Sequence, residues 1–122
     1  SEGSPEVKGR IRQLQQQMAR QRMMQDVPKA DVIVTNPTHF AIALRYDPEQ
    51  DAVPMMVAKA VDDAAMRMRK EVRKYGVPII ENRPLARALY KVGKPGKPIP
   101  PDLYRAVAEI IAQVMRLKAG VR

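Results

Sequence analysis

The sequence predicts an α/β domain: a small, mainly four-stranded sheet with helices packed around it, preceded by a long N-terminal linker helix. Two observations predict this fold class. Short runs of β-branched and apolar residues alternate with longer stretches of helical periodicity. The chain also has 122 residues, of which 45% are hydrophobic, enough for one modest core. We divide it into a linker helix in 1–28 and a domain in 29–122.

The first predicted helix runs from Val7 to about Gln25. Its apolar residues recur at spacings of four, three and four, which places them on one face: Val7, Ile11, Leu14 and Met18. Most of the remaining residues are Gln, Arg and Lys, so the apolar stripe is thin and the helix needs a partner or a continuing helix upstream. We expect it to end at Asp26-Val27-Pro28, because a residue before proline is disfavoured in the α region.

Three strands are predicted next, in 31–36, 40–46 and about 55–59. The second strand contains the run FAIAL, which alternates poorly and therefore indicates a strand covered on both faces. The residues in 47–53 are those of a turn. The segment after that turn also fits the start of a helix, but we favour a strand followed by a helix that begins near Val61.

The second helix keeps its apolar residues at helical spacing as far as position 75: Val61, Ala64, Ala65, Met68, Val72 and Tyr75. Its charges match the helix dipole, with Asp62 and Asp63 near the N-terminus and Arg73 and Lys74 near the C-terminus. Gly76 fits the left-handed position just past a helix end.

A short buried strand is expected in 77–80, a helix in 84–92 that is closed by Gly93, and a Pro/Gly connector in 93–101. The helix in 84–92 is interpreted as structural, and three of its side chains are expected on the sheet: Leu85, Leu89 and Tyr90. The last helix is predicted in 101–118. Its buried stripe is expected to consist of Leu103, Val107, Ile110, Val114 and Leu117.

Composition excludes several classes of function. The chain has no Cys and one His, which rules out the common zinc clusters, and it contains no P-loop and no G-x-S-x-G motif. We therefore expect no metal and no cofactor. The formal charge is +9, from 22 Lys and Arg against 13 Asp and Glu, which favours anionic neighbours. The charges are scattered and aromatic residues are few, so nucleic-acid binding is kept only as an alternative and no nucleic acid is expected. No apolar run reaches the length of a membrane span.

The tetrapeptide Asn36-Pro37-Thr38-His39 separates the first two strands. Ordinary Asn deamidation requires attack by the following backbone nitrogen, and Pro37 has no N–H, so that path is closed. The remaining intramolecular reaction is attack of the Asn36 side-chain amide on its own main-chain carbonyl, which breaks the Asn36–Pro37 bond. The reaction is a single-turnover self-cleavage with no external substrate.

Each residue of the tetrapeptide has a candidate role in such a cleavage. Pro37 restricts Asn36 to extended conformations. His39 is a candidate for proton transfer, and Thr38 for orienting a group or donating to the oxyanion. A plain β-turn, with Asn at its first position and Pro at its second, explains the same four residues. From these residues alone, both interpretations stay open.

Four segments carry a resemblance to a known family, in this order and spacing: KADVIVTNPTHFAIALRYD, VPII, RPLARALY and IPPDLYRAVAEIIAQV. They resemble the cytoplasmic domain of the FlhB/YscU family, the export-switch proteins of flagellar and virulence type III secretion. The likeness extends from about Glu6 to Leu117. The N-terminal part, up to the tetrapeptide, is more similar to the flagellar branch than to the virulence branch. The resemblance implies that this chain is a soluble fragment, without the family's membrane-spanning N-terminal half, to which the linker helix would lead.

The resemblance also implies an activity and a setting. It implies autocleavage between Asn36 and Pro37, with the C-terminal piece remaining associated, and a switch of export from rod- and hook-type to filament-type substrates. The implied partners are other flagellar export-apparatus proteins, export substrates and the hook-length-control protein. The implied location is the cytoplasmic face of the bacterial inner membrane. A scaffold that uses the tetrapeptide only as a turn is the alternative.

Family likeness further suggests a small apolar patch that recognises cargo. The matching positions in this sequence are Val53, Pro54, Ala108 and Ile111. Ala108 and Ile111 share a helix face at a spacing of three, as such a patch requires. Packing in the core explains the same residues equally well.

Overall fold

The computed structural model describes residues 3–37 and 39–120 and confirms the α/β fold. Its sheet has the strand order β3-β2-β1-β4. The strands are β1 (Val32–Asn36), β2 (Phe40–Arg45), β3 (Met55–Val61) and β4 (Ile79–Glu81). β2 pairs antiparallel with both β1 and β3, whereas β4 lies parallel to β1. β1 is therefore an inner strand with a hydrogen-bonded partner along each edge.

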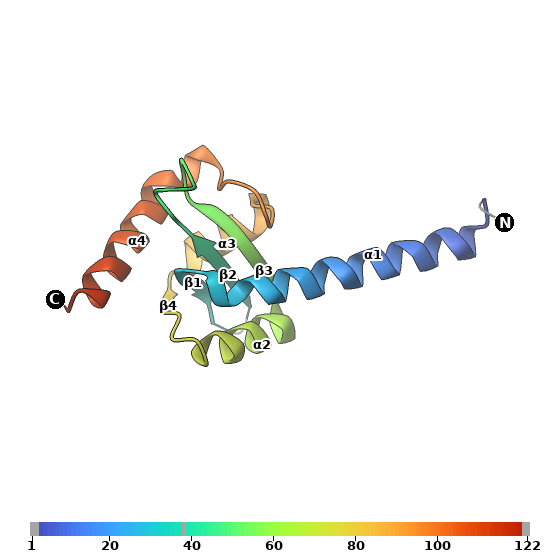
Figure 1. Ribbon diagram of the computed structural model, residues 1–122, viewed down its shortest axis with the longest axis horizontal. Helices are drawn as coiled ribbons and strands as arrows, with labels where there is room; N and C mark the ends of the chain where they lie inside the picture. The colour runs from blue at the N-terminus through green and yellow to red at the C-terminus, as the bar shows by residue number, and fades with distance from the viewer. Residues whose placement is uncertain (1–2, 38, 121–122) are drawn as a thin grey trace.

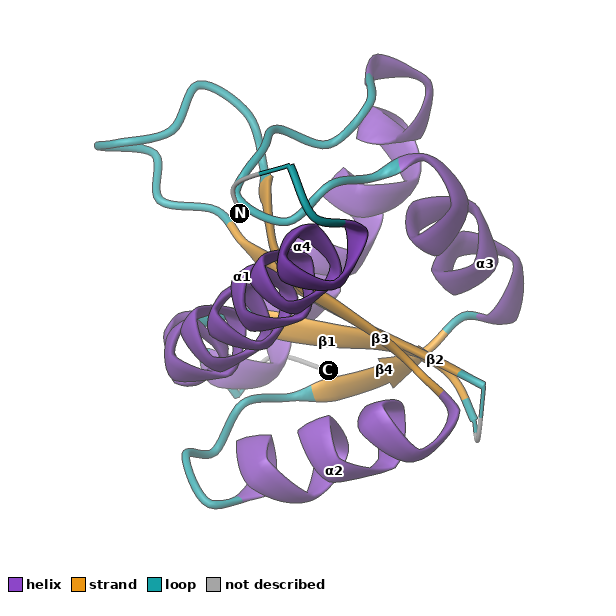
Figure 2. Ribbon diagram, turned by 90° about the vertical axis from the view of Figure 1, so that its right-hand side faces the viewer, coloured by secondary structure: helices purple, strands orange, loops and turns teal. Residues whose placement is uncertain are grey.

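Four α-helices accompany the sheet: α1 (Pro5–Asp26), α2 (Asp62–Arg73), α3 (Arg83–Val92) and α4 (Tyr104–Lys118). α1 projects away from the rest of the chain as a long rod (Figure 1), and none of its residues is buried. α2 covers one face of the sheet and α3 lies on the other (Figure 2). No helix within 3–37 and 39–120 is both long enough and apolar enough to cross a bilayer.

The sheet separates two apolar clusters, and β1 contributes to both. Its side chains alternate between the faces, as the pleat requires. Val32 and Val34 pack with α3 and α4, whereas Ile33 packs with α2. All three side chains are fully buried. β2 is likewise buried on both faces over Ala41–Leu44, which confirms the prediction from its poor alternation.

The N-terminal helix ends where the sequence predicts, but not for the predicted reason. Val27 keeps a right-handed helical conformation, with φ −54° and ψ −40°, even though Pro28 follows it. The chain continues through a 3₁₀ turn, Val27–Lys29, and becomes extended only at Ala30. Val27 is fully buried in the cluster under α2. Tertiary burial thus overrides the local preference of a residue before proline.

Other element boundaries differ from the predicted ones by one to three residues. β3 continues to Val61, so α2 begins at Asp62, and β4 occupies Ile79–Glu81 rather than 77–80. Three apolar side chains that the helical patterns place on packing faces are exposed: Val61 by 37%, Tyr75 by 57% and Leu117 by 57%. Tyr75 follows the end of α2, and Leu117 lies in the last turns of α4, which extend beyond the sheet (Figure 1).

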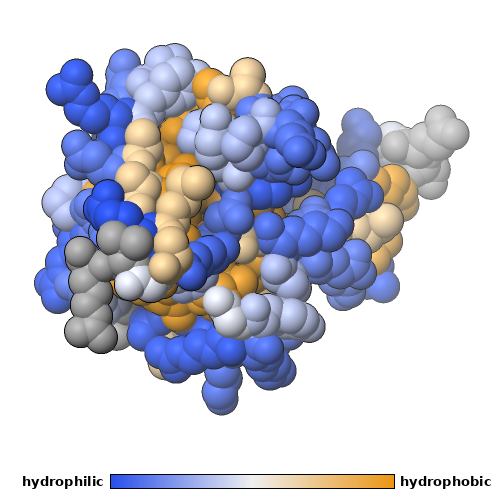
Figure 3. All heavy atoms as spheres, turned by 60° about the vertical axis from the view of Figure 1, so that its left-hand side comes forward, coloured by the Kyte–Doolittle hydropathy of each residue, from blue (hydrophilic) through white to orange (hydrophobic). Residues whose placement is uncertain are grey.

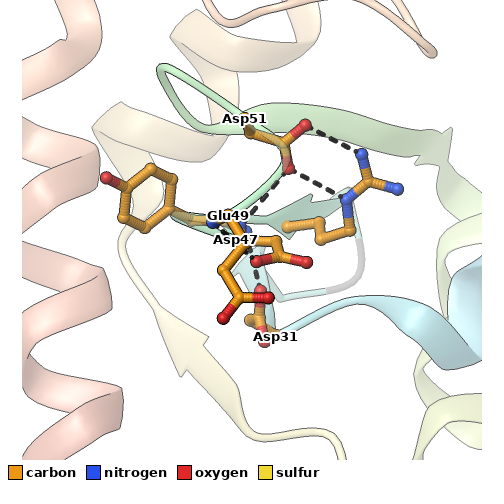
Figure 4. Close-up of polar contacts among 6 residues, drawn as sticks. Asp31, Asp47, Glu49 and Asp51 are labelled. Atoms are coloured by element: carbon orange, nitrogen blue, oxygen red, sulfur yellow. Dashed lines mark hydrogen bonds and ion pairs between the residues drawn. The ribbon is translucent and has the colours of Figure 1, made fainter.

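A network of polar contacts organises the loop between β2 and β3 (Figure 4). The Arg45 guanidinium donates to both carboxylate oxygens of Asp51, at 3.2 and 3.1 Å. Asp51 also accepts from the backbone N–H of Asp47, and the Asp31 carboxylate accepts from the N–H of Tyr46. These bonds hold the long loop against the end of the sheet, and the chain leaves it through Val53 and Pro54.

Gly93, just after α3, has no room for a side chain. A Cβ built there lies 2.7 Å from the carbonyl oxygen of Leu89 and also overlaps the side chain of Met56. Gly93→Ala is expected to destabilise the domain by about 1–3 kcal/mol, because the backbone must shift. The thermal unfolding midpoint, measured at equal protein concentration, checks this.

Gly9→Ala is the matched control, since nothing lies within 4 Å of a Cβ at Gly9 in α1. It is expected to leave the midpoint unchanged or raise it slightly through helix propensity. An unchanged midpoint for Gly93→Ala would contradict the close packing between the end of α3 and Met56.

Candidate functional site

Asn36 is the last residue of β1 and is fixed from both sides of the strand. Its side chain and backbone are almost fully buried, with 6% exposure. On one side Asn36 pairs with Phe40 of β2. On the other side, the carbonyl of the preceding Thr35 accepts a hydrogen bond from the backbone N–H of Asn82, at 3.0 Å. The strand therefore holds Asn36 firmly, and the chain leaves it into a short loop.

The loop is closed by a hydrogen bond to the carbonyl group of Asn36. The backbone N–H of His39 donates to the Asn36 carbonyl oxygen at 3.0 Å. This is the bond of a β-turn between its first and fourth residues, so a turn is present as predicted. The same carbonyl carbon is the one that the Asn36 amide would attack. A donor on its oxygen polarises that carbon and stabilises negative charge as it develops.

Thr38 lies outside the described residues, so its predicted role stays a prediction. Pro37 is half-buried and His39 is exposed. The structure thus brings Asn36, Pro37 and the backbone of His39 together in one turn. The N–H of His39 is a candidate oxyanion donor that the residue types alone do not indicate.

A carboxylate that the sequence analysis treated only as a helix-dipole charge lies beside His39. Asp62 Oδ1 is 3.7 Å from His39 Nδ1, and the backbone N–H of Asp62 donates to the His39 carbonyl at 2.9 Å. Asp62 has a φ of 51°, and it is the one non-glycine residue with positive φ in 3–37 and 39–120. The antiparallel pairing of β2 with β3 produces this contact, because Phe40 lies opposite Val61.

Next to the turn, Phe40 belongs to a cluster of aromatic and cationic side chains that includes Lys59 of β3 and Tyr90 of α3. The rings of Phe40 and Tyr90 stack with their centroids 4.7 Å apart. Lys59 Nζ lies 4.9 Å from the centre of the Tyr90 ring and donates to the carbonyl oxygens of Tyr90 and Gly93, both at 3.0 Å. The ammonium group therefore caps the C-terminal end of α3. Tyr90, Leu85 and Leu89 all pack as predicted.

The four candidate cargo residues fall on two separate elements. Val53 and Pro54 are half-buried at the end of the β2–β3 loop, and the Pro54 carbonyl accepts from the N–H of Ile99. On α4, Ala108 is exposed, whereas Ile111 is half-buried and packs against the core. Figure 3 shows a strip of apolar atoms bordered by hydrophilic ones on the face that carries the C-terminal end. Cargo recognition by these residues stays a prediction.

Comparisons with known proteins identify the family. The model of the "FlhB HrpN YscU SpaS Family" matches residues 1–114. The flagellar biosynthetic protein FlhB of Bacillus subtilis is 50% identical over 121 residues, which is 99% of this chain and 34% of that protein. The crystal structure of the cytoplasmic domain of FlhB from Shewanella putrefaciens has a TM-score of 0.77 and 45% identity, covering 80% of this chain and 75% of that one.

A more distant structural neighbour is the EscU C-terminal domain, solved with an Asn→Ala substitution. It has a TM-score of 0.72 and 35% identity, and the match covers 75% of this chain and 92% of that one. The same domain has also been solved with substitutions of the Pro directly after that Asn and of the His two residues further on.

The fold is therefore the one found in the cytoplasmic domain of FlhB from Shewanella putrefaciens. The chain belongs to the FlhB/HrpN/YscU/SpaS family. It spans about a third of the length of the Bacillus subtilis relative. The resemblance found in the sequence, including the likeness to the flagellar branch, is confirmed.

Replacing Lys59 tests the cluster behind the turn. Lys59→Met keeps most of the apolar stem and is expected to destabilise the domain by about 1–3 kcal/mol, because two carbonyl groups at the end of α3 lose a charged donor. The thermal unfolding midpoint measures the effect. Lys91→Met, at an exposed position of α3, is the control and is expected to change the midpoint little. Equal midpoints for the two variants would contradict the capping role.

Proposed function

We propose that this chain is a self-cleaving regulatory domain of a bacterial flagellar protein-export apparatus. Family membership supports the setting. One observation carries the cleavage: the carbonyl of Asn36 sits at the end of a buried inner strand and accepts a hydrogen bond from the N–H of His39, at 3.0 Å. The peptide bond that follows joins Asn36 to Pro37. Because the Pro37 nitrogen carries no hydrogen, it cannot attack the Asn36 side chain in a competing deamidation.

The reaction is an Asn cyclisation. Asn36 Nδ2 forms a bond to the main-chain carbonyl carbon of Asn36 and loses a proton. The bond between that carbon and the Pro37 nitrogen breaks, and the nitrogen takes up a proton. The products are a five-membered succinimide at residue 36 and a new N-terminal amine at Pro37, and water then opens the succinimide. An amide is a weak nucleophile, so the rate depends on positioning within the folded turn.

His39 is proposed to carry the proton from the attacking amide to the departing nitrogen, and Thr38 to support the turn. The EscU variants provide a parallel for these positions. An Asn, the Pro after it and the His two residues further on were each replaced in that domain. Asn36, Pro37 and His39 have the same residue types and the same spacing. The parallel supports a shared site.

Both pieces are proposed to stay together after cleavage. The piece 1–36 contributes β1, which is paired with β2 and β4, and three fully buried side chains of that strand, Val32, Ile33 and Val34. It also contributes Val27, fully buried under α2. Burial of such apolar side chains contributes roughly 1.5–3 kcal/mol each, so separation requires opening of the core.

In the assembled apparatus, the domain is proposed to act at the cytoplasmic face of the inner membrane. There it switches export from rod- and hook-type to filament-type substrates, together with other export-apparatus proteins and the hook-length-control protein. Val53, Pro54, Ala108 and Ile111 are its proposed cargo contacts. The exposed, basic α1 is proposed to connect to a preceding membrane domain.

A mass measurement tests the cleavage directly. Intact chain is isolated under denaturing conditions, refolded, and analysed by mass spectrometry over time. Pieces 1–36 and 37–122 are expected to appear, and Asn36→Ala is expected to keep a single intact mass with an unchanged thermal midpoint. Pro37→Ala is expected to cleave more slowly, because a new N–H then competes for the side chain.

The chain offers a matched control in its other Asn. Asn82 caps α3 by accepting from the N–H of Leu85 at 3.1 Å, and Asn82→Ser preserves a capping oxygen. This variant is expected to cleave normally. A wild-type chain that folds but keeps its intact mass would support the non-cleaving scaffold instead.

Retention of the pieces is tested by native size-exclusion chromatography of cleaved protein. The two pieces are expected to elute together, and to separate only in guanidinium. Ile33→Ala removes a fully buried side chain of β1 and is expected to cost about 2–5 kcal/mol, which weakens association of the pieces by at least about thirtyfold.

Ile11→Ala is the control for this experiment, because Ile11 is 50% exposed on α1. It is expected to leave association unchanged. Separation of the unmutated pieces under native conditions would contradict a retaining role for β1.

A further inference from the structure

We propose that Asp62 is a positioning residue for His39: its carboxylate holds the imidazole so that Nε2 serves the Asn36–Pro37 bond. This inference deepens the proposed cleavage and rests on it. His39 is the one His in the sequence. Asp62 is not part of the tetrapeptide. It is the first residue of α2 and directly follows the C-terminal end of β3.

Two contacts fix Asp62 against the turn. Its backbone N–H donates to the His39 carbonyl at 2.9 Å, which ties the start of α2 to the residue that closes the turn. Its side-chain Oδ1 lies 3.7 Å from His39 Nδ1. That separation is longer than a hydrogen bond, and catalytic contacts of this kind often shorten only as the reaction proceeds. The backbone contact keeps the carboxylate within reach of the ring.

The backbone of Asp62 supports a role beyond starting a helix. Its φ of 51° lies in the left-handed region, which Asp adopts more readily than most residues with a side chain but less readily than glycine. Glycine would fit this position without strain. The carboxylate held there lies beside the one imidazole of the sequence, and this placement supports a positioning role.

The chemistry follows from the two ring nitrogens of a neutral imidazole, of which one carries the proton. A carboxylate at Nδ1 favours the form with the proton on Nδ1, which leaves Nε2 with a free lone pair. Nε2 then takes the proton that Asn36 Nδ2 loses on attack. The resulting imidazolium, stabilised by Asp62, gives that proton to the Pro37 nitrogen. The imidazole ends in its starting form, and no external acid or base is consumed.

The size of the effect is limited by solvent. The His39 and Asp62 side chains are 65% and 70% exposed. Ion pairs at such positions contribute at most about 1 kcal/mol, which corresponds to an effect on the cleavage rate of roughly two- to fivefold. High salt is expected to reduce it.

Refolding kinetics test the inference. Asp62→Gly removes the carboxylate and relieves the strained φ, so it is expected to raise the thermal midpoint and yet slow cleavage two- to fivefold. Asp62→Glu is expected to restore part of the rate. Asp63→Asn, the neighbouring exposed carboxylate, is the matched control and is expected to cleave at the unmutated rate.

A double-mutant cycle separates positioning from a general effect on the loop. In a His39→Ala chain, Asp62→Gly is expected to have no further effect on the rate, because the group it positions is gone. An equal slowing with and without His39 would overturn the inference, as would an unmutated rate in Asp62→Gly. Neither result affects the proposed cleavage, which fails only if the unmutated chain folds and stays intact.

A second readout does not depend on cleavage. In the Asn36→Ala chain, the ring nitrogens of His39 give an unambiguous NMR signal, since there is no other His. The nitrogen shifts at a pH where the ring is neutral are expected to show the Nδ1–H form, and Asp62→Gly is expected to move them toward the Nε2–H form. Identical shifts in the two chains would overturn the inference.

Discussion

The inner position of β1 is the constraint on which the rest of the structure depends. β1 is hydrogen-bonded along both edges and buried on both faces, so it cannot leave without opening both apolar clusters. Its last residue, Asn36, is consequently held in place, while the peptide bond after it lies in a loop that no strand pairs. A cut at that bond removes a connection between β1 and β2 but none of the contacts that hold them together.

The register of the sheet assembles the site at one end of the strands. β1 ends at this end, β2 begins here, and β3 ends here, because β2 is antiparallel to both neighbours. The turn, the start of α2 and the N-terminal end of α3 therefore lie at the same end of the sheet. Asn82 of the α3 cap bonds Thr35, and Asp62 of α2 bonds His39. The start of α3 thus fixes the residue before the turn, and the start of α2 fixes the last residue of the turn.

The element types could be predicted from the sequence because the patterns of strands and helices are dominated by local periodicity. The boundaries that differ are those decided by tertiary contacts. Val27 stays helical before a proline because it is buried. Leu117 is exposed because the C-terminal turns of α4 extend beyond the sheet. From their residue types, Asn36 and Pro37 could be named as candidates for the proposed cleavage. Asp62 could not, because its place beside His39 depends on strand register and on a positive φ, neither of which the residue types specify.

The turn and the proposed reaction centre are compatible interpretations of the tetrapeptide, because one hydrogen bond serves both. The His39 N–H closes the turn and polarises the carbonyl that would be attacked in the proposed cleavage. An interaction formed by folding is therefore already in place before the reaction, and no solvent needs to reorganise around the oxygen as charge develops. The proposed cleavage therefore depends on folding. A chain in which the turn is not formed lacks the His39 donor, so cleavage is expected to follow folding of the sheet.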